Sequence, residues 1–233
     1  AVDETGMGNV HDKTLKNQNV CSFLLNYYRD VQLGGMRPNS ETNAIEVARP
    51  AGVVMGLVAS TSPIATLYFK VLISLMTRNV LILSPHPISA ACTAHATDYL
   101  HDVAVRAGAP KNCIQIQRSL SLGATEKLMS DSRIKVIVAT GGSPMVRAAY
   151  SSGRPALGVG PGNVPVIIDE GVNLNDTAEF IIGSKNFDHG SPCNSESTVI
   201  PLASIANSFG QALKAKGAHL CNPQETQKLR DYA

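Results

Sequence analysis

The stretch VVMGLVASTSPIATLYFKVLISLMTRNVLILS, residues 53–84, decides the fold. An apolar, Val-rich run (53–59) leads through Ser-Thr-Ser-Pro into a nearly all-apolar segment (63–77), and a second apolar run (80–84) follows. We interpret these parts as a buried strand, a buried helix and a second buried strand, because turn residues separate runs of strand and helix length. A membrane span is the alternative, and the polar interruption argues against it.

The same alternation continues toward the C-terminus. Strand-like runs at 113–117 and 134–140 alternate with helix-like segments at 87–106, 123–129 and 144–150. Strands joined through helices pair in parallel with right-handed crossovers. The sequence therefore predicts an α/β fold with a Rossmann-like open parallel sheet and helices on both faces, followed by the start of a second α/β domain.

The flanking segments predict further parts of this architecture. Residues 5–30 have the pattern of an amphipathic helix, and residues 31–50 indicate a hairpin arm. A Gly- and Pro-rich run, 151–165, indicates a crossover between domains. We expect a first domain at 1–158 and an incomplete second domain at 159–233, with strands at 166–169 and 197–201 and a helix at 176–185. Two short strands and one helix bury little apolar surface. We therefore expect seven side chains of the second domain to be partly uncovered: Val166, Ile167, Ile168, Ile181, Ile182, Val199 and Ile200.

The composition excludes several classes of protein. The chain has 233 residues, of which 44% are hydrophobic, 16% charged and 5% aromatic, which argues against a disordered chain, a collagen-like repeat or a coiled coil. Its net charge of +2 gives no reason to expect nucleic acid or an anionic membrane as a partner. Five widely spread Cys without a CxxC pair favour a reducing, cytoplasmic compartment over a disulfide framework.

Three turns, at Ser60–Ser62, Ser84–His86 and Thr140–Ser143, follow predicted strands, at the sheet edge where open α/β folds bind ligands. The Gly141-Gly142 turn, between Thr140 and Ser143, either admits a phosphate at the start of a helix or is a simple tight turn, and it lacks a GxGxxG fingerprint. Ser84 and His86 follow the second strand without an acidic residue, so a 2′-phosphate is not excluded, and His86 is either a ligand contact or an ordinary loop residue.

Cys193 is the candidate nucleophile. It lies in a polar loop rich in Gly, Pro, Asn and Ser, where an exposed thiolate is plausible, although a surface or packing role fits the local sequence as well. Cys92, His95 and His101 share one predicted helix, but their spacing does not place all three on one face, so the sequence predicts no metal site.

Four segments together carry a resemblance to a known family: 4–17 (ETGMGNVHDKTLKN), 62–87, 139–170 and 184–200. They resemble the CoA-acylating branch of the aldehyde dehydrogenase family, over nearly the whole chain. The resemblance implies that Cys193 is the catalytic thiol and that Ser62, where the family commonly has Asn, donates to an oxyanion. It also implies a cofactor-binding domain at 1–158 and the thiol-bearing part of a catalytic domain at 159–233. The implied cofactor-binding residues are Ser60, Thr61, Ser84, His86, Thr140, Gly141, Gly142 and Ser143.

The resemblance further implies a reaction and its partners. A short-chain aldehyde, coenzyme A and NAD or NADP would give an acyl-CoA through a Cys193 thioester, in a homo-oligomer. Hydrolytic relatives carry a Glu in the stretch matching Leu157–Gly162, and this chain has none there, which favours acyl transfer to CoA over release of a free acid. Because family members are longer, we expect the chain to be a piece of a longer protein. A hydrolytic dehydrogenase and a truncated, non-catalytic dinucleotide-binding or assembly module remain the alternatives.

Overall fold

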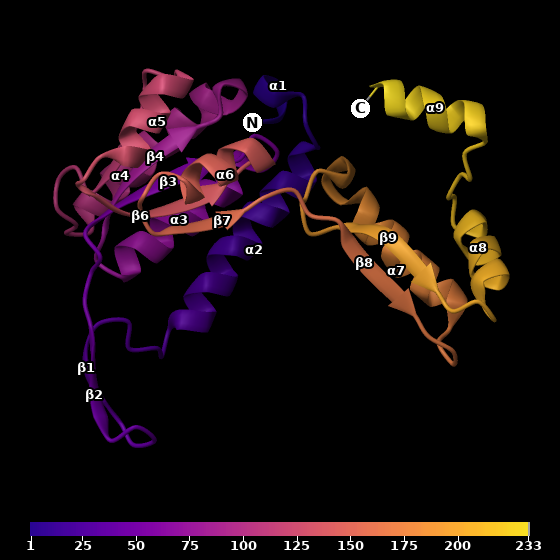
Figure 1. Ribbon diagram of the computed structural model, residues 1–233, viewed down its shortest axis with the longest axis horizontal. Helices are drawn as coiled ribbons and strands as arrows, with labels where there is room; N and C mark the ends of the chain where they lie inside the picture. The colour runs from indigo at the N-terminus through magenta and orange to yellow at the C-terminus, as the bar shows by residue number, and fades with distance from the viewer. Residues whose placement is uncertain (233) are drawn as a thin grey trace. The chain divides into compact units, whose positions relative to one another are not determined.

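The computed structural model describes residues 1–232 and divides into two compact units, one formed by residues 1–161 and the other by the residues from 162 onward (Figure 1). The first unit is built on a five-stranded sheet in the order β5-β4-β3-β6-β7, and every neighbouring pair in it is parallel. Its strands are β3 (Val53–Val58), β4 (Val80–Pro85), β5 (Ile114–Ile116), β6 (Ile134–Thr140) and β7 (Ala156–Val159).

Helices cover both faces of this sheet. On one face α3 (Pro63–Met76) and α4 (Ala90–Arg106) pack on Val54 and Val58. On the other face, α5 (Leu122–Ser130) and α6 (Ser143–Tyr150) pack on Met55 and Leu57. Because successive side chains of a strand point to opposite faces, one apolar strand fills both cores. The predicted open parallel α/β sheet with helices on both faces is confirmed.

The helix predicted at 5–30 is confirmed over α2 (Val10–Tyr28), but its predicted start is wrong. A separate short helix, α1 (Val2–Thr5), precedes it. Gly6 and Gly8 separate them with positive φ angles of 67° and 69°, and the Asn9 side chain caps α2 by accepting from the Asp12 amide. α2 packs on α3, which brings its first turns close to the loop before α3.

The predicted hairpin arm at 31–50 is confirmed. β1 (Gly35–Asn39) pairs antiparallel with β2 (Ala44–Ala48), and the pairing puts Met36 opposite Val47 and Pro38 opposite Ile45. These side chains share one face of the hairpin, and Met36 and Ile45 are about 70% exposed, at 69% and 70%. The hairpin therefore presents an apolar face that nothing in its own unit covers.

The run 151–165 is not simply a crossover, which corrects the prediction. Ala156–Val159 forms β7, the edge strand beside β6, with Ile137 opposite Ala156. It is only four residues long and lies in a Gly- and Pro-rich run, so its pairing with β6 decides its conformation. The helix predicted at 87–106 begins as a short 3₁₀ turn, η1 (Pro87–Ser89), before α4.

The second unit is a smaller α/β layer. Its parallel strands β8 (Val164–Ile168) and β9 (Glu196–Pro201) carry α7 (Leu174–Asn186) and α8 (Ala206–Ala215) on one face. The 3₁₀ turn η2 (Phe187–Gly190) leads toward β9, and α9 (Pro223–Tyr232) follows α8. None of the helices formed by residues 1–232 has the length and hydrophobicity that a membrane span requires.

The prediction of uncovered apolar residues in this unit is partly wrong. Ile168 and Ile181 are buried, at 3% and 8% exposure, because α7 and α8 enclose them with Phe209. Ile167 and Ile200 point to the other face of the strands and are 72% and 48% exposed. One face of this two-stranded layer is therefore covered and the other is bare.

Candidate active site

The carboxyl ends of β3 and β6 mark the point where the strand order reverses. From β3 the chain moves to β4 and β5 on one side, and it then crosses to β6 and β7 on the other. Open α/β sheets bind ligands in the crevice at such a switch point. The loop Ser60–Ser62 leaves β3 there, and Thr140–Gly142 leaves β6. The structure thus brings two of the three predicted turns to neighbouring positions.

Two lysines of α2 hold the loop Ser60–Ser62. The buried Lys13 ammonium donates to the Thr61 carbonyl oxygen at 2.9 Å, and Lys16 Nζ donates to Ser62 Oγ at 2.7 Å. Ser62 precedes Pro63, but its side chain does not cap α3, and its oxygen accepts from Lys16. A hydroxyl that accepts from an ammonium keeps its own proton for donation and becomes a stronger donor. Sequence reasoning missed both lysines.

Lys70, on α3, reaches the carboxyl end of β6. Sequence reasoning missed it as a site residue. Its side chain is 1% exposed, and Nζ donates to Thr140 Oγ1 at 2.9 Å. The stem of Lys70 passes Gly56 of β3, where an added Cβ would come within 2.9 Å of Lys70 Cδ. Burial lowers the pKa of Lys70 to about 7. A buried amine that titrates near neutrality therefore supports the turn after β6.

Replacing Lys70 with Met is expected to flatten the pH dependence of stability. With a folded pKa of about 7 and an unfolded value of 10.5, the unfolded chain binds more protons between these pH values. The free energy of unfolding of the parent therefore rises with pH across that window, by at most about 1.4 kcal/mol per pH unit from this group. Urea unfolding at several pH values between 7 and 10 measures the slope. Lys135→Met, at an exposed position, is the matched control and should keep the parental slope.

The two glycines after Thr140 have no structural need to be glycine. Neither Gly141 nor Gly142 has a positive φ, and a Cβ at either position would meet only ordinary contacts at 3.8 Å. The absence of side chains here therefore leaves open space at the start of α6, where backbone amides and the helix dipole favour an anion. Ser143 is the first residue of α6 and is exposed.

The third predicted turn is less open than the sequence suggested. Ser84 is the fifth residue of β4, is 5% exposed, and its hydroxyl lies 3.5 Å from Thr125 Oγ1 on α5. His86 is exposed, and its Nδ1 accepts from the Ile88 amide, which caps η1. Of this pair, only His86 faces solvent.

Cys193 belongs to the second unit and is exposed. Three consecutive residues with positive φ angles, Asp188 (50°), His189 (55°) and Gly190 (70°), precede its loop. Asp188 is fully buried, and its carboxylate accepts from Ser191 Oγ at 2.7 Å. Such a strained backbone persists only where its surroundings fix it, and it is typical of functional loops.

The far side of the Cys193 loop is fixed by polar contacts and by close packing. Ser195 is buried and donates through its hydroxyl to the Pro192 carbonyl at 2.9 Å. Parallel pairing sets Val164 opposite Glu196, so the residues before β8 lie beside the loop before β9. A Cβ built on Gly162 would overlap the carbonyl oxygen of Cys193. The thiol is thus exposed on a loop whose backbone is closely held.

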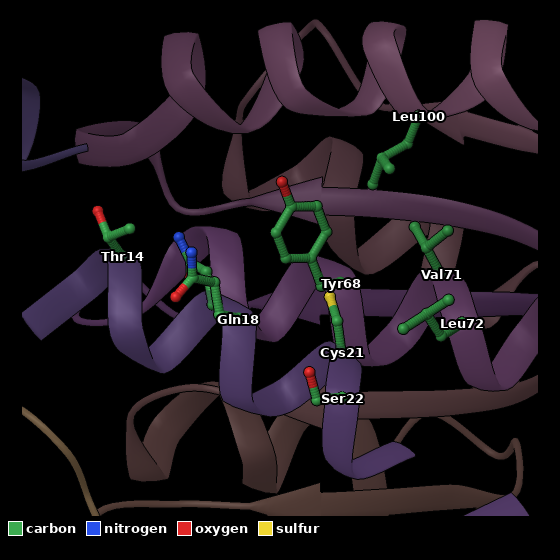
Figure 2. A pocket seen from close by; sticks show the side chains of 9 residues that line it. Thr14, Gln18, Cys21, Ser22, Tyr68, Val71, Leu72 and Leu100 are labelled. Carbon is green, nitrogen blue, oxygen red and sulfur yellow. The ribbon is translucent and has the colours of Figure 1, made fainter. Parts of the chain in front are cut away.

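A hollow in the first unit is lined by other side chains. A hollow of about 600 Å³ lies between α2, α3 and α4, and none of the predicted site residues lines it (Figure 2). Tyr68 and Cys21 form part of its wall, and burial raises the pKa of both. Of the histidines on α4 considered for a metal site, His101 accepts instead from the Asn112 amide through Nε2.

Several known proteins are similar to this chain in sequence or in structure. The aldehyde-alcohol dehydrogenase AdhE of Escherichia coli (strain K12), a bifunctional protein, is 40% identical over 99% of this chain and 26% of its own length. The crystal structure of an acetylating aldehyde dehydrogenase from Geobacillus thermoglucosidasius matches with 45% identity and a TM-score of 0.91, covering 97% of this chain and 50% of that one. The Rhodopseudomonas palustris propionaldehyde dehydrogenase with bound propionyl-CoA matches with 29% identity and a TM-score of 0.84, over 99% and 51%.

The chain therefore spans about a quarter of the bifunctional relative and about half of each of these solved structures. The family model described as "Aldehyde dehydrogenase family" matches residues 8–228. Because this match includes nearly all of both units, the chain belongs to the aldehyde dehydrogenase family.

Proposed function

We propose that this chain supplies the cofactor edge and the nucleophile of a CoA-acylating aldehyde dehydrogenase. The reaction converts a short-chain aldehyde, coenzyme A and NAD(P)+ into an acyl-CoA, NAD(P)H and a proton. The observation that carries the proposal is the exposed Cys193 thiol on a closely held loop, packed against Gly162. No carboxylate occurs in Leu157–Gly162 to activate water against a thioester.

The chemistry of Cys193 is covalent. Its thiolate sulfur forms a bond to the aldehyde carbonyl carbon, and the carbonyl oxygen takes the negative charge. The Cys193 amide and the Ser62 hydroxyl are the proposed donors to that oxygen, with Lys16 strengthening Ser62. When bound, NAD(P)+ would accept the hydride from the former carbonyl carbon. Loss of that hydride leaves an acyl group on Cys193 as a thioester. The thiolate of coenzyme A then takes the acyl group and releases the Cys193 thiolate.

The open space beside Gly141 and Gly142, at the start of α6, supports a dinucleotide site at this edge. We propose that Thr140, Gly141, Gly142 and Ser143 border the dinucleotide, with Ser60 and Thr61 across the switch point and Ser84 and His86 toward the adenosine. Lys70 positions Thr140 in this scheme. The similar propionaldehyde dehydrogenase with bound propionyl-CoA supports coenzyme A as the second substrate.

Replacing Gly142 with Val is expected to weaken NAD(P)H binding by at least about tenfold, because the side chain would fill the space that a phosphate approaches. Isothermal titration with each dinucleotide measures the effect. Gly123→Val, in α5, is the control, since a Cβ there meets nothing within 4 Å and Gly123 lies outside the proposed site. Equal affinity of Gly142→Val and the parent would remove this turn from the cofactor site.

We further propose a cytoplasmic homo-oligomer in which the hairpin arm contacts another subunit. Support comes from its bare face of Met36, Pro38, Ile45 and Val47, since an isolated two-stranded hairpin is marginally stable in water. Free cysteines among the described residues fit a reducing compartment. Sedimentation velocity of the purified protein tests the assembly.

A panel of short aldehydes tests the proposed reaction, assayed in the complete enzyme with each dinucleotide, with and without coenzyme A. We expect NAD(P)H formation to depend on coenzyme A and the product to be the acyl-CoA. Free acid formed at equal rate without coenzyme A would establish the hydrolytic alternative. Dinucleotide binding without turnover of any aldehyde would establish the non-catalytic one.

A further inference from the structure

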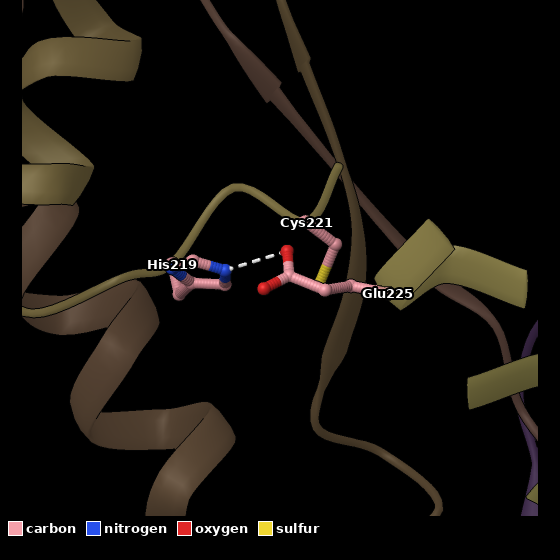
Figure 3. Close-up of side chains that lie close together, drawn as sticks. All are labelled: His219, Cys221 and Glu225. Atoms are coloured by element: carbon pink, nitrogen blue, oxygen red, sulfur yellow. Dashed lines mark hydrogen bonds and ion pairs between the residues drawn. The ribbon is translucent and has the colours of Figure 1, made fainter. Parts of the chain in front are cut away.

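Three potential metal ligands meet where α9 begins. His219 and Cys221 lie in the segment after α8, and Glu225 lies in the first turn of α9 (Figure 3). One ligand atom from each side chain, a ring nitrogen, the thiol sulfur and a carboxylate oxygen, lies within 4.8 Å of the other two. This is the one such group of three found among residues 1–232. Sequence reasoning, which considered only Cys92, His95 and His101, missed it.

The positions of two of these ligands are already fixed. Asn222 caps α9 by accepting from the Glu225 amide at 2.9 Å, and the Glu225 carboxylate accepts in return from the Asn222 amide at 2.8 Å. This reciprocal pair holds the carboxylate beside the segment that carries Cys221. His219 Nε2 lies 3.0 Å from the same carboxylate oxygen. The site is therefore largely assembled before any ion binds.

The donor set matches one class of ion. Thiolate, imidazole and carboxylate together favour Zn²⁺ or another borderline first-row cation over Mg²⁺ or Ca²⁺, which take oxygen ligands. Bond lengths of about 2.0–2.3 Å place the donors of a tetrahedral zinc site about 3.3–3.8 Å apart. A shift of about 1 Å in the side chains would bring the present donors to that spacing. His219 is 71% exposed and Glu225 is 43% exposed, so both side chains have room for it.

We propose that His219, Cys221 and Glu225 bind one Zn²⁺-class divalent cation, with the fourth coordination position left to water. Binding replaces the contact between His219 and Glu225 with bonds from both to the ion. The Cys221 thiol gives up its proton to solvent and binds as the thiolate. The site is separate from the proposed chemistry of Cys193 and does not depend on it.

The structure also indicates what the ion would stabilise. α9 buries none of its residues, and isolated helices of this length are marginal in water. A cation shared between the preceding segment and the first turn would hold the start of the helix by coordinate bonds, where no buried side chain of α9 does so. We therefore infer a structural role, in which the ion orders α9.

Titration of the full chain with Co²⁺, followed by displacement with Zn²⁺, tests the site. We expect one equivalent of Co²⁺ to give a thiolate-to-metal absorption band that Zn²⁺ abolishes. Cys221→Ser should remove the band, and His219→Ala should weaken binding by at least about tenfold. Hydrogen exchange of the α9 amides should slow on addition of Zn²⁺ in the parent and stay unchanged in Cys221→Ser.

Two controls separate this site from other thiols. Cys92→Ser and Cys193→Ala should each keep the band, since neither residue belongs to the group. Loss of the band in Cys193→Ala together with its retention in Cys221→Ser would place the ion on the exposed nucleophile and overturn the proposal. A parent protein without the band, or with unchanged α9 exchange, would overturn it as well.

Discussion

Cys193→Ala is expected to lower acyl-CoA formation in the complete enzyme by at least about a thousandfold, because no other group in the loop can hold the acyl chain as a thioester. Dinucleotide binding should be unchanged, since the proposed cofactor turns belong to the first unit and Cys193 to the second. Steady-state assays of acyl-CoA give the first quantity, and fluorescence titration with NADH or NADPH gives the second.

A direct readout of the intermediate accompanies this variant. The unsubstituted enzyme is incubated with aldehyde and NAD(P)+ but without coenzyme A, and its peptides are then analysed by mass spectrometry. The peptide that contains Cys193 should gain the mass of the acyl group. Cys21→Ala, which removes a half-buried thiol of the first unit, is the matched control and should keep both acylation and turnover. Retention of more than a few per cent of activity by Cys193→Ala would show that another residue carries the acyl group.

The sheet could be predicted from the sequence because its signals are local. Each of β3, β4 and β6 is a continuous apolar run followed by turn residues, and β6 ends at Thr140 as predicted. The β7 strand could not, because four residues in a Gly-rich segment become a strand only by pairing with β6. Local pattern therefore identifies central strands and fails for an edge strand whose conformation depends on its neighbour.

The supporting residues of the site depend on contacts between distant segments. Lys70 is visible in the sequence as the single charge of an apolar helix, but its partner is 70 residues away, and its path requires Gly56 in β3. Lys13 and Lys16 reach the Ser62 loop only because α2 packs on α3. The turn residues in the sequence thus indicate where a site lies. The lysines that contact those turns can be identified only from the packing of the helices.

The contact between Gly162 and Cys193 also joins segments that are distant in the sequence. It leads to the second prediction, a large loss of turnover when Gly162 is replaced. Parallel pairing of β8 with β9 brings the chain before each strand to one end of the layer. A Cβ at Gly162 would overlap a backbone carbonyl oxygen, which cannot rotate away as a flexible side chain can. Gly162→Ala therefore has to displace the Cys193 loop itself.

We expect Gly162→Ala to lower kcat/KM for acyl-CoA formation by about a hundredfold, since a displacement of about 1 Å at a reacting group costs that much. NAD(P)H affinity should stay at the parental value. Gly160→Ala is the matched control two residues earlier, where a Cβ meets nothing within 4 Å, and it should keep normal turnover. The rate of Cys193 alkylation by iodoacetamide reports the loop directly and should change only in Gly162→Ala. Equal turnover in the two variants would mean that the thiol tolerates movement of its backbone, and that the close packing at Gly162 serves folding rather than the position of the nucleophile.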